Sequence, residues 1–213
     1  MTGKSHLAIG LGIGAIACAY YPFSPSNAAV YLSVAGFSAL SADLDGPSIL
    51  SRKITKLSKL LRQLALWAGI ALAAGMAYLL LALNRFDFAY AICATVALLL
   101  GLIAKQGAIR NALVSLIGGA LIFGGWRIGH PWLIGLGAFV AWAPWLKHRG
   151  LTHTVWAVAA WGAIGYGLER QSGIEGLAAV AVAGYVSHLL ADTMTPSGVK
   201  WIYPLYDKSF KLR

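Results

Sequence analysis

The sequence predicts an all-α, polytopic integral membrane protein, a helical bundle of about eight membrane segments. Hydrophobic residues make up 59% of the 213 residues and charged residues only 11%, whereas about a quarter of the residues in a soluble domain are charged. Apolar runs cover nearly the whole length, and the polar stretches between them are too short to fold alone. We therefore expect one membrane-embedded domain over residues 1–213.

Turn-forming and charged residues divide the apolar sequence into its elements. The eight predicted segments cover residues 6–21, 28–42, 64–83, 88–104, 112–125, 132–145, 151–168 and 174–190. In the same order, they are separated by residues 22–27, 43–63, 84–87, 105–111, 127–131, 147–150 and 169–173. Segment 64–83 can cross the hydrocarbon alone, but a run of about 14 to 16 residues reaches only roughly 21 to 24 Å of the required 30 Å. The shorter segments must extend into flanking residues or be sheltered by neighbours.

An even number of segments places both termini on one side of the membrane, together with the loops 43–63, 105–111 and 146–150. That side holds 14 of the 17 basic residues, so the positive-inside rule makes it cytoplasmic. We expect a multi-pass protein of the plasma membrane with both termini in the cytoplasm. The net charge of +10 follows from this topology and from attraction to anionic lipid headgroups. No nucleic-acid partner is expected, because the chain has no soluble recognition element.

Seven ionisable residues lie at the edges of the predicted segments, all on the cytoplasmic side. They are His6, Asp43, Asp45, His148, His153, His188 and Asp192. The remaining histidine, His130, falls on the opposite side, and we interpret it as an interfacial loop residue. Imidazole and carboxylate groups are metal ligands, so the gathering of seven of them predicts a metal site.

Two pairs within this set have metal-binding spacing. His188 and Asp192 are four residues apart, so on a helix they share a face and could bind one ion. Asp43 and Asp45 precede Gly46, where a turn could bring two carboxylates together. Each pair also has a plainer explanation: a histidine bonded to a neighbouring carbonyl, and a helix ended by turn-forming residues.

The stretch KHRGLTHT, residues 147–154, is the strongest local signal. It places His148 and His153 on either side of a glycine break, and Thr152 could cap the following helix. Lys147 and Arg149 could neutralise a substrate phosphate, although cations here also follow from the topology. A charged loop with interfacial histidines explains the cations but not the gathering of all the candidate ligands.

The donor set suits a divalent metal ion, zinc first, with manganese or iron as alternatives. Seven ligands exceed what one zinc needs, so we expect two or more ions. Asp43 or Asp45 would bridge them or act as the catalytic base. Such centres activate water against phosphoesters.

Residues 52–62 predict a basic amphipathic helix, with Ile54, Leu57, Leu60 and Leu61 opposite five cations. A helix of this kind would lie in the headgroup layer and bind anionic lipid. A solvated connector is the alternative.

Together these elements resemble a known family, the membrane-bound, metal-dependent hydrolases that include the LexA-regulated YdjM-like proteins of bacteria. The matching elements are His6 with Gly10, the Asp43-Leu-Asp45 loop, the His148-Arg-Gly-Leu-Thr-His153 block, and His188-x-x-x-Asp192 followed by Thr195, Gly198 and Pro204. The family is distantly similar to zinc-dependent phospholipase C and the S1/P1 nucleases, all-helical enzymes with a trinuclear zinc cluster built from His and Asp. The resemblance implies phosphoester hydrolysis and leaves the substrate open.

We interpret the chain as a membrane-bound hydrolase that cleaves a phosphoester of a phospholipid, or of another phosphorylated membrane substrate, at the cytoplasmic face. A metal or ion transporter is one alternative, for which ionisable residues near helix middles would be expected. A non-enzymatic membrane scaffold, whose polar residues only cap helices, is the other.

Overall fold

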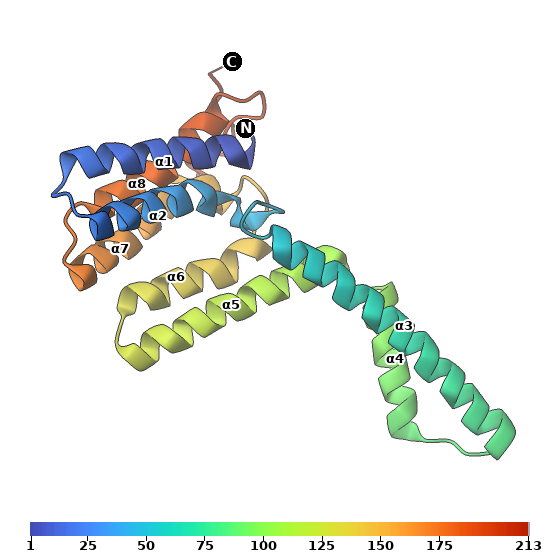
Figure 1. The fold of residues 1–213 in the computed structure, drawn as a ribbon. Helices are drawn as coiled ribbons and strands as arrows, with labels where there is room; N and C mark the ends of the chain where they lie inside the picture. Colours follow the sequence, from blue (N-terminus) through green and yellow to red (C-terminus); the bar gives the residue numbers. More distant parts are fainter. Residues whose placement is uncertain (213) are drawn as a thin grey trace. The chain divides into compact units, whose positions relative to one another are not determined.

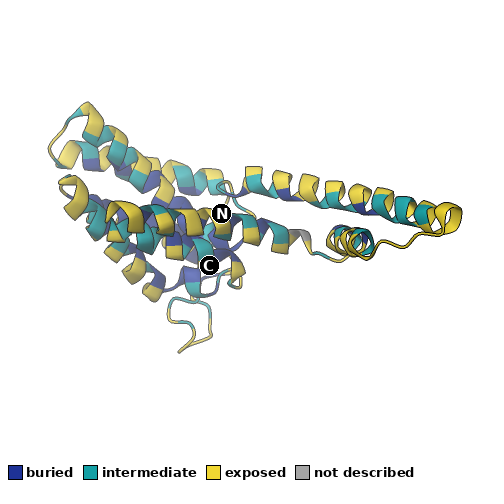
Figure 2. Ribbon diagram, turned by 90° about the horizontal axis from the view of Figure 1, so that it is seen from below, coloured by how far each residue is buried: buried dark blue, intermediate teal, exposed yellow. Residues whose placement is uncertain are grey.

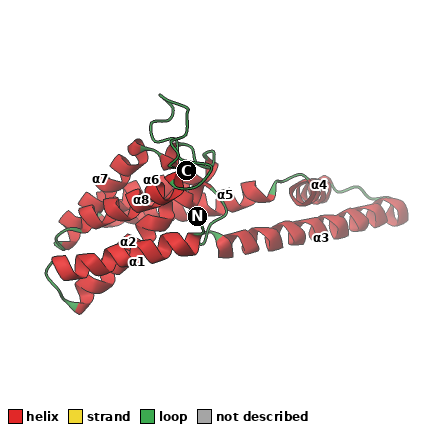
Figure 3. Cartoon of the chain, turned by 90° about the horizontal axis from the view of Figure 1, so that it is seen from above, coloured by secondary structure: helices red, strands yellow, loops and turns green. Residues whose placement is uncertain are grey.

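The computed structural model describes residues 1–212, and this range is all-helical (Figures 1 and 3). Its α-helices are α1 (Gly3–Tyr20), α2 (Pro25–Ser41), α3 (Arg52–Leu83), α4 (Phe88–Leu102), α5 (Gln106–Ile128), α6 (Pro131–Trp142), α7 (Val155–Ser172) and α8 (Leu177–Thr193). Three short 3-10 helices, η1 (Ala42–Asp45), η2 (Ala143–Trp145) and η3 (Leu151–His153), lie between them. Each predicted segment corresponds to one of the α-helices, so the all-α prediction is confirmed.

The chain divides into two compact units. One consists of residues 52–113, and the other combines residues 1–51 with residues 114–213, of which 213 lies outside the described range. The first unit is built on α3 and α4, which approach closely at two glycines. A Cβ on Gly69 would lie 2.6 Å from the backbone nitrogen of Leu98, and one on Gly101 would lie 2.5 Å from Cα of Leu66.

The predicted amphipathic helix over residues 52–62 is not a separate element. It is the first part of α3, which continues without a break for 32 residues, or about 48 Å at 1.5 Å per residue. The charged residues interrupt the hydropathy of this region but not its helical backbone, because Lys, Arg, Leu and Gln are all good helix formers.

In the larger unit, α1, α2, α7 and α8 pack side by side (Figure 1). Their facing sides form the buried interior seen in Figure 2. Small residues allow the close approach: a Cβ on Gly10 of α1 or on Gly184 of α8 would lie within 2.8 Å of the carbonyl oxygen of Ala35 on α2. Helices that touch through glycine faces are typical of membrane bundles.

An aromatic cluster fixes the end of this unit that carries the polar residues. Trp161 of α7 and Tyr185 of α8 are both buried, with ring centroids 5.4 Å apart. The Trp161 indole donates to the Ser38 hydroxyl at 2.8 Å, and the Tyr185 hydroxyl donates to the carbonyl oxygen of Thr152 at 2.6 Å. The second bond ties η3 to α8 and so sets the position of the residue that follows, His153.

Within the described residues, two helices are long and apolar enough to cross a membrane: α3 and residues 107–128 of α5. Helices α4 and α8 are apolar but shorter. The eight membrane crossings of the expected bundle therefore stay a prediction.

Candidate metal centre

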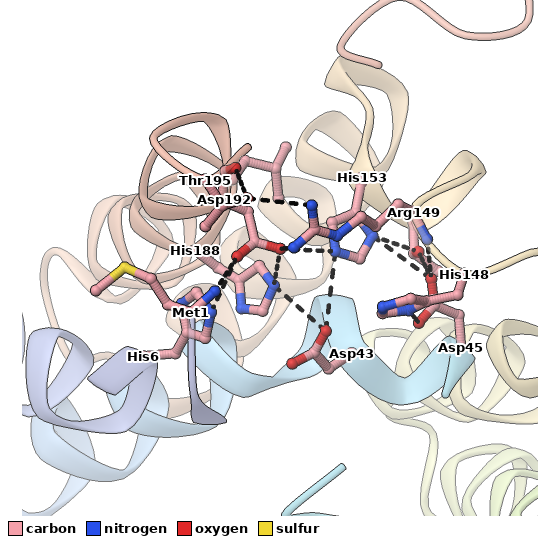
Figure 4. Close-up of polar contacts among 12 residues, drawn as sticks. Met1, His6, Asp43, Asp45, His148, Arg149, His153, His188, Asp192 and Thr195 are labelled. Atoms are coloured by element: carbon pink, nitrogen blue, oxygen red, sulfur yellow. Dashed lines mark hydrogen bonds and ion pairs between the residues drawn. The ribbon is translucent and has the colours of Figure 1, made fainter. Parts of the chain in front are cut away.

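All seven predicted ligands converge at one end of the larger unit (Figure 4). Antiparallel packing brings the start of α1 to the ends of α2 and α8, and the connection between α6 and α7 lies beside them. Helix α1 contributes His6, η1 contributes Asp43 and Asp45, the connection contributes His148 and His153, and the last turns of α8 contribute His188 and Asp192. The structure thus joins residues that are up to 186 positions apart in sequence.

The hydrogen bonds of two buried histidines determine which ring nitrogen is free. His188 Nδ1 lies 2.7 Å from the carbonyl oxygen of Ala39, and a carbonyl only accepts, so Nδ1 carries the proton. The Thr152 hydroxyl donates to Asp45 Oδ2 at 2.7 Å, so it accepts from His153 Nδ1 at 3.0 Å. In both rings Nε2 is left with a lone pair, is buried, and has no hydrogen-bond partner among the described residues.

Two carboxylate oxygens face these nitrogens. Asp43 Oδ1 lies 3.6 Å from His188 Nε2 and 3.9 Å from His153 Nε2, and Asp192 Oδ2 lies 3.9 Å from each. These distances are too long for hydrogen bonds. Ligand atoms about 2.0 to 2.1 Å from a tetrahedral zinc are about 3.3 to 3.4 Å from one another. The ligand atoms of His153, His188 and Asp192 all lie within 4.8 Å of one another, so these three residues could hold an ion, and Asp43 faces both imidazoles.

Asp45 is engaged differently, because its oxygens already accept three close hydrogen bonds. Oδ1 lies 2.7 Å from His148 Nδ1, and Oδ2 accepts from the Thr152 hydroxyl at 2.7 Å and from the backbone N–H of Arg149 at 3.0 Å. His153 Nδ1 lies 3.5 Å from the same Oδ2. The carboxylate thus orients two imidazoles, the arrangement by which acidic residues support histidine ligands in metal sites.

Asp192 connects the cluster to a cation and to a third buried imidazole. Its Oδ2 accepts from Arg149 Nη2 at 2.9 Å, and Arg149 is itself held by the Thr195 hydroxyl at 3.2 Å. Asp192 Oδ1 lies 3.4 Å from His6 Nε2. The His6 ring stacks on His188 with centroids 3.9 Å apart, and its Nδ1 has no partner among the described residues. A second group of ligand atoms, from His6, Asp43 and His188, could therefore also hold an ion.

Hydrogen bonds and neighbouring charges oppose the effect of burial on the acidic groups. Burial raises the pKa of Asp45, but contacts with His148 and His153 outweigh it and hold the pKa well below its ordinary value. Burial likewise raises the pKa of Asp43, and the nearby imidazoles of His188 and His153 lower it further than burial raises it. The hydrogen bond that His148 donates to Asp45 raises the pKa of His148, whereas burial lowers that of His153, which precedes α7. At neutral pH both carboxylates are charged and His153 is neutral, the states that metal binding requires.

Sequence reasoning missed the role of Thr152. The cap of α7 is Thr154 rather than the expected Thr152, because the Thr154 hydroxyl accepts from the N–H of Ala157. Thr152 points into the cluster and connects a histidine to a carboxylate. Its position beside His153 within the 147–154 stretch was the available signal. The carbonyl of Ala39 gave none, since a backbone acceptor is set by tertiary packing alone.

The two cations expected to meet a phosphate have different surroundings. Arg149 lies in the cluster, bonded to Asp192, whereas the Lys147 side chain is exposed. Lys147, His148, Arg149 and Lys200 line a polar pocket of about 320 Å³, together with Asp207, which pairs with Lys200. A phosphate in this pocket would have cations around it and the histidine–aspartate cluster next to it.

Comparison with known proteins identifies a family. The sequence profile described as YdjM inner membrane protein matches residues 1–213, the full length of the chain. No curated protein and no solved structure matches the chain.

Proposed function

The chain belongs to the YdjM inner membrane protein family, and from this premise we propose that it is a membrane-bound, metal-dependent hydrolase of phosphoesters. The substrate would be a phospholipid or another phosphorylated membrane molecule. The expected cofactor is zinc, with manganese or iron as alternatives, in two or more ions.

The observation that carries the proposal is the pair of unpartnered lone pairs. His153 Nε2 and His188 Nε2 are buried, and both face oxygens of Asp43 and Asp192. A buried acceptor without a donor costs about 1 to 3 kcal/mol, so a helix-capping scaffold has no reason to keep two of them together. A cation bound among them would remove this cost.

The residues would divide the work by their surroundings. A divalent ion held there would act as a Lewis acid and lower the pKa of a bound water to about 7. Asp43 is the partly exposed carboxylate, at 22% of its side-chain area, and is placed to accept a proton from water at its free oxygen. In the reaction, the water oxygen bonds to phosphorus, the ester P–O bond breaks, and the leaving alkoxide takes up a proton. Lys147 and Arg149 would neutralise the phosphate oxygens.

The finer topology belongs to the same proposal. With eight crossings and both termini in the cytoplasm, the ligand cluster would lie at the cytoplasmic face, where the basic loops lie. Cysteine labelling of intact cells at Asn84 and at Ser209 should reach the first site from the outside and not the second. Labelling of both positions from outside would contradict this topology.

Metal analysis of detergent-purified protein tests the metal centre without relying on turnover. We expect stoichiometric zinc in the natural protein and its loss in a His188→Gln variant, which keeps a polar side chain but removes the imidazole. His130→Gln is the matched control, since His130 precedes α6 away from the cluster, and it should retain the metal. Absence of metal from natural protein, with no phosphatase activity after zinc, manganese or iron is supplied, would refute the proposal.

A further inference from the structure

An apolar groove runs along α6 and α7, outside the ligand cluster. Its volume is about 650 Å³, within the range of about 300 to 1,000 Å³ in which proteins bind small molecules. Small side chains from the two helices leave the space open, and Phe139 and Trp142 form part of its wall. The small residues are Gly135, Ala138, Ala160, Ala163 and Gly167.

A smaller hollow adjoins the groove near the ligand cluster. A second hollow of about 120 Å³ shares Phe139, Trp142 and Ala160 with it, so the two are adjacent. The lining of this hollow extends to Thr152. The hydroxyl of Thr152 donates to Asp45 Oδ2, so the smaller hollow borders a residue that is bonded directly to the cluster.

A polar space lies on the other side of the same carboxylate. His148 bonds to Asp45 Oδ1, and it lines the polar pocket together with Lys147 and Lys200. Asp45 Oδ2 is thus bonded to Thr152, which lines the apolar hollow. Asp45 Oδ1 is bonded to His148, which lines the polar pocket. A molecule with a hydrocarbon chain and a phosphate has the same division of polarity.

We propose that the groove between α6 and α7 binds the hydrocarbon chain of a lipid phosphate and so selects long-chain substrates. Binding of the phosphate rests on the proposed function. Binding of the hydrocarbon chain rests on the groove alone. A packed helix from a second copy is the other occupant to consider, yet a helix is about 10 Å across and could not enter the adjoining hollow of 120 Å³. A flexible chain could. The hydrocarbon chain would move from the bilayer into an apolar groove, so its surroundings would stay apolar. Selectivity would therefore come from van der Waals packing along the groove.

Ala160→Phe tests the proposal at a residue that lines both hollows. The matched control is Ala159→Phe, the same change on the next residue, which is exposed and does not line the groove. We expect Ala160→Phe to lower kcat/KM for hexadecyl phosphate by about tenfold or more, the scale on which a misplaced methylene discriminates in an apolar pocket. Butyl phosphate turnover should fall much less, because a four-carbon chain is too short to fill the groove, and zinc content should equal that of Ala159→Phe. Ala163→Phe, farther along α7, should shift the preference towards shorter chains.

Photolabelling separates this proposal from the hydrolase proposal. A hexadecyl phosphate with a diazirine near the chain end should label peptides of α6 and α7 in the natural protein and in Ala159→Phe, and not in Ala160→Phe. If these helices are labelled but no phosphate is hydrolysed, the groove proposal holds and the hydrolase proposal is refuted. Hydrolysis with unchanged chain preference in Ala160→Phe would refute the groove. Loss of self-association in Ala160→Phe, with labelling retained, would also overturn it and assign the groove to a second copy.

Discussion

Thr152 offers a test of whether the cluster is built to present histidine lone pairs. Thr152→Val keeps the shape of the side chain and removes the hydroxyl that donates to Asp45 and accepts from His153. The Nδ1 proton of His153 then loses its acceptor, and the ring is no longer held with Nε2 facing the other ligands. Loss of such a supporting contact typically lowers metal affinity by about 10- to 100-fold.

The magnitude can be worked out for a thermal shift. At a free zinc concentration 100 times the natural dissociation constant, binding stabilises the fold by about 2.7 kcal/mol. If the affinity of Thr152→Val falls 100-fold, the same concentration stabilises it by only about 0.4 kcal/mol. Without metal, the variant should also lose about 1.5 to 3 kcal/mol, because the missing hydrogen bond is made to a charged, buried carboxylate.

The matched control is Thr154→Val, two residues further on. Thr154 is also buried, but its hydroxyl caps α7, so its loss should cost about 0.5 to 2 kcal/mol and leave zinc affinity unchanged. Zinc affinity is measured by competition with a chromogenic chelator, and stability by thermal melting in detergent with and without zinc. Equal zinc affinity in Thr152→Val and the natural protein, or an equal loss in both variants, would refute the reasoning.

Three further predictions concern other parts of the chain. The hydrogen bond between His148 and Asp45 raises the pKa of His148. This bond therefore stabilises metal-free protein below about pH 6.5, and the stabilisation is lost as pH rises through the raised pKa. The Tm should fall over that pH range, and His148→Gln should flatten the fall. Gly10→Ala should destabilise the fold by about 1 to 3 kcal/mol, because its Cβ would lie 2.7 Å from Cβ of a residue on α2. The control, Gly12→Ala, meets nothing within 4 Å and should stabilise the fold by roughly 0.5 to 1 kcal/mol. Equal melting temperatures of the two variants would contradict this prediction. Replacing the five cations of residues 52–62 with Gln should weaken the preference for anionic liposomes, and an unchanged preference would show that this region is a solvated connector.

The sequence predicted the helices well because apolar runs and breakers coincide in this chain. The errors lie where the two signals separate. Residues 52–68 contain neither Gly nor Pro, so the charges that end the apolar run do not end the helix, and α3 runs from Arg52 to Leu83. In segment 151–168 the α-helix instead begins later than the predicted segment, since η3 occupies residues 151–153 and α7 starts only after the Thr154 cap.

The gathering of the candidate ligands could be predicted because each lies at a helix end, and alternating helices bring such ends together. The protonation of the rings could not be predicted in the same way. It depends on the carbonyl of Ala39 for His188 and on a hydroxyl shared with Asp45 for His153. These partners lie on other elements, so only tertiary packing reveals which nitrogen of each ring is left for a ligand.

The Asp43-Leu-Asp45 loop shows how one backbone conformation gives two similar residues different roles. A 3-10 helix has about 3.0 residues per turn, so side chains two positions apart point about 240° apart rather than to one spot. Asp45 is directed into the protein, where three donors within 3.0 Å occupy its oxygens. Asp43 is directed towards the free nitrogens of His153 and His188, with no contact shorter than 3.6 Å to them. Asp43 therefore has an oxygen that faces two free nitrogens, whereas both oxygens of Asp45 already accept hydrogen bonds. Both carboxylates stay candidate ligands, because Asp43, Asp45 and His148 also offer ligand atoms within 4.8 Å of one another.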